Sequence, residues 1–106
     1  MAQPAELGRL DASVERLRVS IAAFTEDPSA KREVLRDVFA VDDAIGRMAR
    51  ALPSMKTALR EVQLEVNQAT ILVKRDQHRA AGEAFTGVLA SYERVRSALA
   101  ETRPPR

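Results

Sequence analysis

Apolar residues recur at spacings of three and four through most of this chain, in four segments separated by short polar breaks. Such spacing places them on one side of an α-helix, so each segment is predicted to be an amphipathic helix. The four stripes are Leu7, Leu10, Val14, Leu17, Ile21 and Phe24; Val34, Val38, Val41, Ile45, Met48 and Leu52; Met55, Leu59, Val62, Val66, Ala69 and Val73; and Ala81, Phe85, Val88, Tyr92, Val95 and Leu99. Narrow stripes of this kind favour an all-α fold whose helices meet along coiled-coil-like seams.

Two of the three breaks contain a proline, which lacks an amide hydrogen and interrupts a helix. Asp27 and Pro28 predict a capped second helix that begins near Pro28 and runs to about Ala51. Pro53 predicts that a third helix begins directly afterwards. A kinked continuation of the second helix is the alternative at this point.

The third break, residues 74–79, is a run of six polar residues without glycine or proline. The apolar phase changes across it, and a turn capped by Asp76 explains both features. With a turn, the fold is an up-down-up-down four-helix bundle, which is our prediction. Without one, it is a three-helix arrangement with a long C-terminal helix. The 106 residues have room for a single domain, predicted to span residues 1–102 before a flexible tail of residues 103–106.

The composition argues against several classes of function. Without cysteine the chain forms no disulfide and no thiolate metal site. Its 17 Lys and Arg face 15 Asp and Glu, interleaved along the sequence, so we expect no nucleic-acid binding. That expectation covers the arginines near the C-terminus, Arg94, Arg96, Arg103 and Arg106.

Membrane insertion and export are also not expected. No apolar stretch approaches the roughly 20 residues of a membrane span, and charged residues such as Glu6 and Arg9 stand where a signal peptide is apolar. The sequence therefore predicts a cytoplasmic protein without membrane contact.

No motif of a known enzyme chemistry is present, neither a nucleophile elbow nor a phosphate-binding loop. We therefore expect no catalysis, no cofactor and no small-molecule ligand. His78 is the single histidine, and no second histidine or E-x-x-H motif accompanies it as a metal site would require. Its simplest interpretation is an exposed residue in a helix-connecting turn.

Histidine phosphotransfer is the alternative role of His78. The residue and Gly82, four positions on, are similar to the motif of histidine phosphotransfer domains, which are small four-helix bundles with an exposed phosphoaccepting histidine. Ala81 stands where that family has a lysine, while Lys74 and Arg75 lie one turn before the histidine. This resemblance would make His78 the phosphoacceptor.

Several apolar residues fall outside the four stripes. Leu64 and Ile71, seven residues apart, lie almost opposite the third stripe, and Leu72 is also outside it. Leu35 and Phe39 form an i,i+4 pair rotated about 100° from the second stripe, which a wider buried arc would explain. For Leu64 and Ile71 the alternatives are an intermolecular contact or scattered surface hydrophobes.

These residues lead to the predicted function. We expect a non-enzymatic protein–protein interaction module, such as a small adaptor, an assembly factor or a chaperone-like bundle. Its partner is another protein or a second copy, so a homo-oligomer is expected. The predicted partner interface consists of Leu64, Ile71, Leu72, Leu35 and Phe39.

Overall fold

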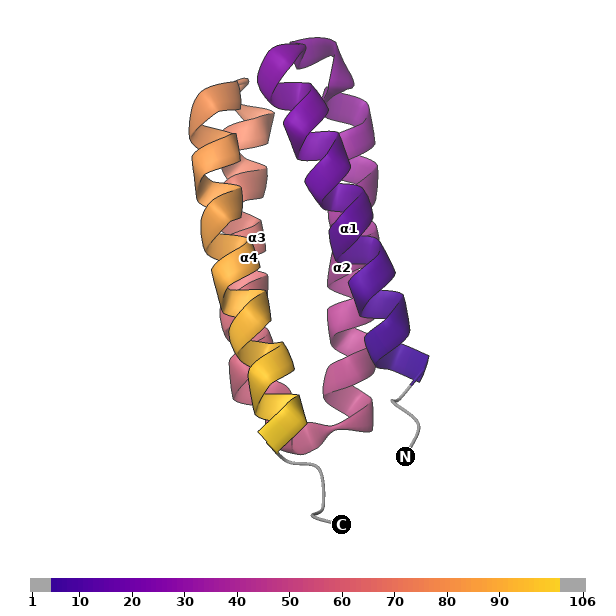
Figure 1. The fold of residues 1–106 in the computed structure, drawn as a ribbon. Coiled ribbons are helices and arrows are strands. Elements are labelled where there is room, and N and C mark those ends of the chain that lie inside the picture. The colour runs from indigo at the N-terminus through magenta and orange to yellow at the C-terminus, as the bar shows by residue number, and fades with distance from the viewer. Residues whose placement is uncertain (1–4, 102–106) are drawn as a thin grey trace.

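The chain folds as an up-down-up-down bundle of four α-helices (Figure 1). The structure is a computed structural model that describes residues 5–101, and the predicted tail of residues 103–106 lies outside the described residues. The elements are α1 (Ala5–Glu26), η1 (Pro28–Ala30), α2 (Lys31–Ala51), η2 (Pro53–Met55), α3 (Lys56–Lys74) and α4 (His78–Glu101), where η marks a single 3-10 turn. The predicted all-α four-helix fold is therefore confirmed, and the three-helix alternative is wrong.

Figure 1 shows two antiparallel hairpins, α1 with α2 and α3 with α4, packed side by side. The turns that close both hairpins lie at one end of the bundle, and the α2–α3 connection lies at the other end. The molecule is elongated, with extents of 48 × 20 × 19 Å. None of the described helices combines the length and the apolar character that crossing a membrane requires.

The two proline breaks lie where the sequence predicts them. The Asp27 carboxylate accepts a hydrogen bond of 3.0 Å from the Ser29 amide, and Pro28 opens η1, which leads directly into α2. Leu52, with φ −131° and ψ 78°, lies outside the α-helical region, as expected for a residue that precedes proline. Because α2 and α3 then run antiparallel, the kinked continuation of the second helix is wrong.

The third break is a turn that ends α3 without glycine or proline. The Gln77 amide donates to the Leu72 carbonyl and the Asp76 amide to the Val73 carbonyl, both at 3.0 Å, which is the Schellman pattern of a helix C-terminus. Asp76 takes the left-handed position of that pattern, with φ 59°. Aspartate tolerates this conformation better than most residues, so Asp76 ends the third helix.

The core is built from the four predicted stripes. All residues of the first and third stripes are buried, and in the second and fourth only the last residues, Leu52 and Leu99, are partly exposed. Because the side chains of all four helices meet in one continuous cluster, burial of these stripes is the main source of stability.

Candidate functional site

Three large apolar side chains are exposed on α2 and α3. Phe39 is 76% exposed, Leu64 55% and Ile71 49%. Leu35 and Leu72, predicted as part of the same interface, are half-buried and pack against the core. A buried side of α2 that is wider than its apolar stripe therefore explains Leu35. The same explanation is wrong for Phe39, because none of the described neighbouring helices covers that side of α2.

Leu64 and Ile71 point away from the bundle because of their helical phase. Each lies about 140–180° around α3 from the buried residues Val62 and Val66, at 100° per residue. Seven residues of α-helix rise about 10 Å, so the two side chains lie two turns apart on one line. That separation matches the repeat with which an amphipathic helix presents its own apolar residues.

The register between α2 and α3 places Phe39 at the same height along the bundle as Leu64 and Ile71. Near one end the Lys31 ammonium donates to the Lys74 carbonyl at 3.1 Å, and further along α2 Asp42 lies beside Gln63. Phe39 comes one turn before Asp42, so it is level with the middle of the Leu64–Ile71 interval on the antiparallel helix. Around α2, Phe39 lies about 60° from Asp42, and around α3 Leu64 and Ile71 lie about 80–100° from Gln63, in each case away from the buried residues. Phe39, Leu64 and Ile71 therefore share one surface, which we call the α2–α3 face.

The exposed charges of the α2–α3 face are predominantly basic. Arg32 and Arg50 lie about 20° from Phe39 around α2, seven residues before it and eleven after it. On α3, the side chains between the apolar pair and α2 include three further cations. These five exposed residues are Arg32, Arg50, Lys56, Arg60 and Lys74.

The five cations keep their charge available to a partner. Within residues 7–99 none of them forms an ion pair. The nearest exposed acid of α2, Asp43, is already paired with Arg47 at 2.9 Å, as its i,i+4 spacing allows. The interleaved charges of the sequence thus sort into a basic surface around an apolar centre, which sequence analysis missed because it depends on which helices are neighbours.

Asp42 lies beneath this face, between α2 and α3. Burial raises the pKa of the Asp42 carboxyl above its ordinary value, and hydrogen bonding to Gln63 offsets part of the effect. Its Oδ1 is buried, and among the described residues it has no hydrogen-bond partner. A buried carboxylate oxygen in this situation destabilises the charged form.

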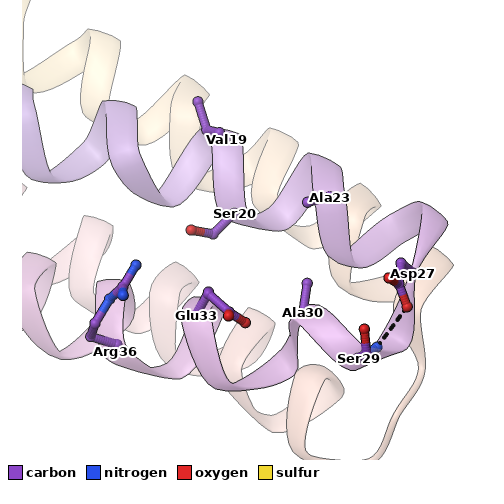
Figure 2. A pocket seen from close by; sticks show the side chains of 8 residues that line it. All are labelled: Val19, Ser20, Ala23, Asp27, Ser29, Ala30, Glu33 and Arg36. Carbon is purple, nitrogen blue, oxygen red and sulfur yellow. Dashed lines mark hydrogen bonds between the residues drawn. The ribbon is translucent and has the colours of Figure 1, made fainter.

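A second polar feature lies between α1 and α2, close to their connection. Figure 2 shows a groove there, lined by Val19, Ser20, Ala23, Asp27, Ser29, Ala30, Glu33 and Arg36. Beside it the Ser20 hydroxyl donates to the buried carboxylate of Asp37, whose other oxygen accepts from Arg36 at 3.3 Å. These contacts satisfy Asp37, so the cluster joins α1 to α2 as a structural element.

His78 is the first residue of α4, where it is half-buried. Its ring lies edge-on to that of Phe24, with ring centroids 6.4 Å apart. The interpretation as an exposed turn residue is therefore wrong, because the Schellman turn ends at Gln77 and brings His78 against the end of α1. Histidine phosphotransfer stays a prediction that no described contact supports.

The described residues contain no group of three His, Asp or Glu side chains placed to hold a metal ion. Comparisons with protein-family models, with curated proteins and with solved structures each gave no match. The fold defines the chain as an all-α four-helix bundle, and the α2–α3 face is its candidate functional site.

Proposed function

We propose that this chain is a non-enzymatic protein–protein interaction module, a small adaptor, assembly factor or chaperone-like bundle in the cytoplasm. It binds through the α2–α3 face. The observation that supports this proposal is the joint exposure of Phe39, Leu64 and Ile71 on two neighbouring helices. Large apolar side chains gathered on one surface are typical of interaction sites, whereas single ones are normal everywhere.

The energetics of burial also favour this function. Covering a side chain of this size is worth about 1.5–3 kcal/mol relative to leaving it exposed, so three together outweigh much of the cost of association. Their backbones belong to regular helices of the bundle, so little conformational entropy is lost when a partner binds.

Site-specific photo-crosslinking in the native host tests the proposal. A photoreactive benzoylphenylalanine at position 39 is expected to capture a protein of defined mass, and Leu64→Lys with Ile71→Lys is expected to abolish that adduct. The control is the same group at Val19, which is 56% exposed on α1, where we expect no adduct.

The mass of the adduct separates the two kinds of partner. The chain has a mass of 11.7 kDa. An adduct of twice that mass identifies a second copy as the partner, and an adduct of any other mass identifies a different protein. Equal yields at positions 39 and 19, or no adduct at either position, would show that the α2–α3 face is not an interaction site. Circular dichroism of the double variant checks that the helices remain folded.

A further inference from the structure

The α2–α3 face differs from an ordinary apolar patch in the charges that surround it. Phe39, Leu64 and Ile71 lie along its centre, with Arg32 and Lys74 toward one end and Arg50, Lys56 and Arg60 toward the other. Of the acids near this face in the described part of the chain, Asp43 is paired with Arg47, Asp76 is paired with Lys31, and Asp42 is half-buried. Glu61 is exposed without an ion pair among the described residues, and it borders Leu64 on the side toward α4.

The acids of α3 lie on its other side. Glu65 faces α4, because a Cβ built on Gly87 of α4 would lie 2.8 Å from its carboxylate, and Glu61, one turn earlier, shares that side. The asymmetry is therefore a property of the tertiary structure, with positive charge directed toward α2 and negative charge toward α4.

We infer that the partner of the α2–α3 face is an acidic amphipathic helix, with apolar residues along one side and Asp or Glu on its flanks. This inference rests on the proposed function and names the chemistry of the partner. Its apolar residues, repeated every three to four positions, would contact Phe39, Leu64 and Ile71. Its flanking carboxylates would lie near the five cations, where opposite charges speed association and fix the orientation of the helix.

Charge also decides against a second copy of this chain as the occupant. Two copies joined through this face about a two-fold axis would bring the same basic residues together, for example Arg60 of one copy near Lys74 of the other. Like charges placed opposite each other oppose association. A nucleic acid fits poorly for another reason, because the centre of the face is apolar where phosphates would require cations.

The inference is tested by fluorescence anisotropy with two labelled synthetic peptides and the full chain. Both peptides carry leucine at positions i, i+3, i+7 and i+10. One has glutamate on the flanks, and the other has lysine at the same flanking positions. We expect the glutamate peptide to bind, with affinity that falls as salt rises, and the lysine peptide to bind at least about tenfold more weakly.

A charge-reversal variant provides the specific readout. Arg32→Glu with Arg60→Glu is expected to weaken the glutamate peptide about tenfold and to strengthen binding of the lysine peptide. The matched control is Arg16→Glu with Arg79→Glu, two exposed arginines on α1 and α4, which should leave both affinities within about twofold. Neither pair takes part in an ion pair of the described residues.

Each alternative occupant predicts a different result. Binding to phosphatidylserine vesicles but to neither peptide would overturn the inference in favour of an anionic membrane surface. A mass of two chains by light scattering, without peptide binding, would overturn it in favour of a second copy. If position 39 still crosslinks to a different protein while the glutamate peptide fails to bind, the partner chemistry is wrong and the interaction function stands. If that crosslink is absent as well, both the interaction function and the inferred partner chemistry are wrong.

Discussion

Asp42 shows how one side chain can make stability depend on pH. Burial raises the pKa of this carboxyl in the folded protein, so folding favours its protonated form. Its contribution to the free energy of unfolding is therefore largest below the ordinary pKa of an aspartate, and is lost as the pH rises through the raised pKa of the folded protein. Once the pH exceeds that raised pKa, the charged carboxylate weakens the α2–α3 contact.

Replacing this carboxyl with an uncharged amide should remove the penalty. We expect Asp42→Asn to raise the free energy of unfolding slightly at pH 7. The gain should disappear at pH 3, where Asp42 is protonated. Urea unfolding at the two pH values measures both differences, with Asp43→Asn as the control, since Asp43 is exposed and paired with Arg47. A variant that is less stable than the wild type at pH 7 would contradict this account.

At the scale of the helix, two glycines differ in how much room the structure leaves for a side chain. Gly46 in α2 has open space where a Cβ would be, with nothing within 4 Å. A Cβ on Gly82 of α4 would lie 3.0 Å from the Thr25 hydroxyl, which is held by a hydrogen bond of 2.8 Å to the Ile21 carbonyl. Gly82 thus permits a close approach of α4 to the end of α1.

Alanine at these two positions should therefore act differently. We expect Gly46→Ala to raise the free energy of unfolding by about 0.5–1 kcal/mol, because alanine loses less backbone entropy in a helix. The same gain at Gly82→Ala should be cancelled by the contact with Thr25. Urea denaturation midpoints of the two variants provide the comparison. Equal gains would mean that the end of α1 moves freely to make room.

At the scale of the whole molecule, the bundle is closed by contacts between its first and last helices. The Tyr92 hydroxyl of α4 donates to the Asp11 carboxylate of α1, and Arg96 Nε lies 3.8 Å from the same oxygen. At the opposite end Lys31 joins the two hairpins through the Lys74 carbonyl and the Asp76 carboxylate, each at 3.1 Å. These polar contacts join the two hairpins near both ends of the bundle.

The contact between Tyr92 and Asp11 should be the stronger part of the α1–α4 closure. Tyr92→Phe removes a partly buried hydrogen bond, and we expect a loss of about 1 kcal/mol and a fall in Tm of about 4 °C or more. Arg96→Gln removes a half-exposed ion pair and should cost less than about 0.5 kcal/mol. Thermal unfolding followed by circular dichroism ranks the two variants. A larger loss of stability in Arg96→Gln than in Tyr92→Phe would mean that the ion pair contributes more to this closure than the hydrogen bond.

Much of the fold was accessible from local patterns. The spacing of residues such as Leu10 and Val66 identifies the buried side of each helix, because the α-helical repeat alone decides which side chains share a side. Asp27 and Pro28 likewise mark a helix start through contacts within a few residues. The turn after Lys74 was harder to predict, because Asp76 replaces the glycine that usually takes the left-handed position.

The candidate site depended on information that no local pattern carries. By itself the sequence determined four amphipathic helices and the exposure of Leu64 and Ile71, because their phase opposes the buried stripe. The tertiary structure alone decided that Phe39 is exposed beside them and that Arg32 and Arg60 share their surface. It also placed His78 against Phe24. The physical reason for this difference is that the helical repeat alone decides which residues of one helix share a side. Which other helix lies next to each remaining side is decided by how the two hairpins pack.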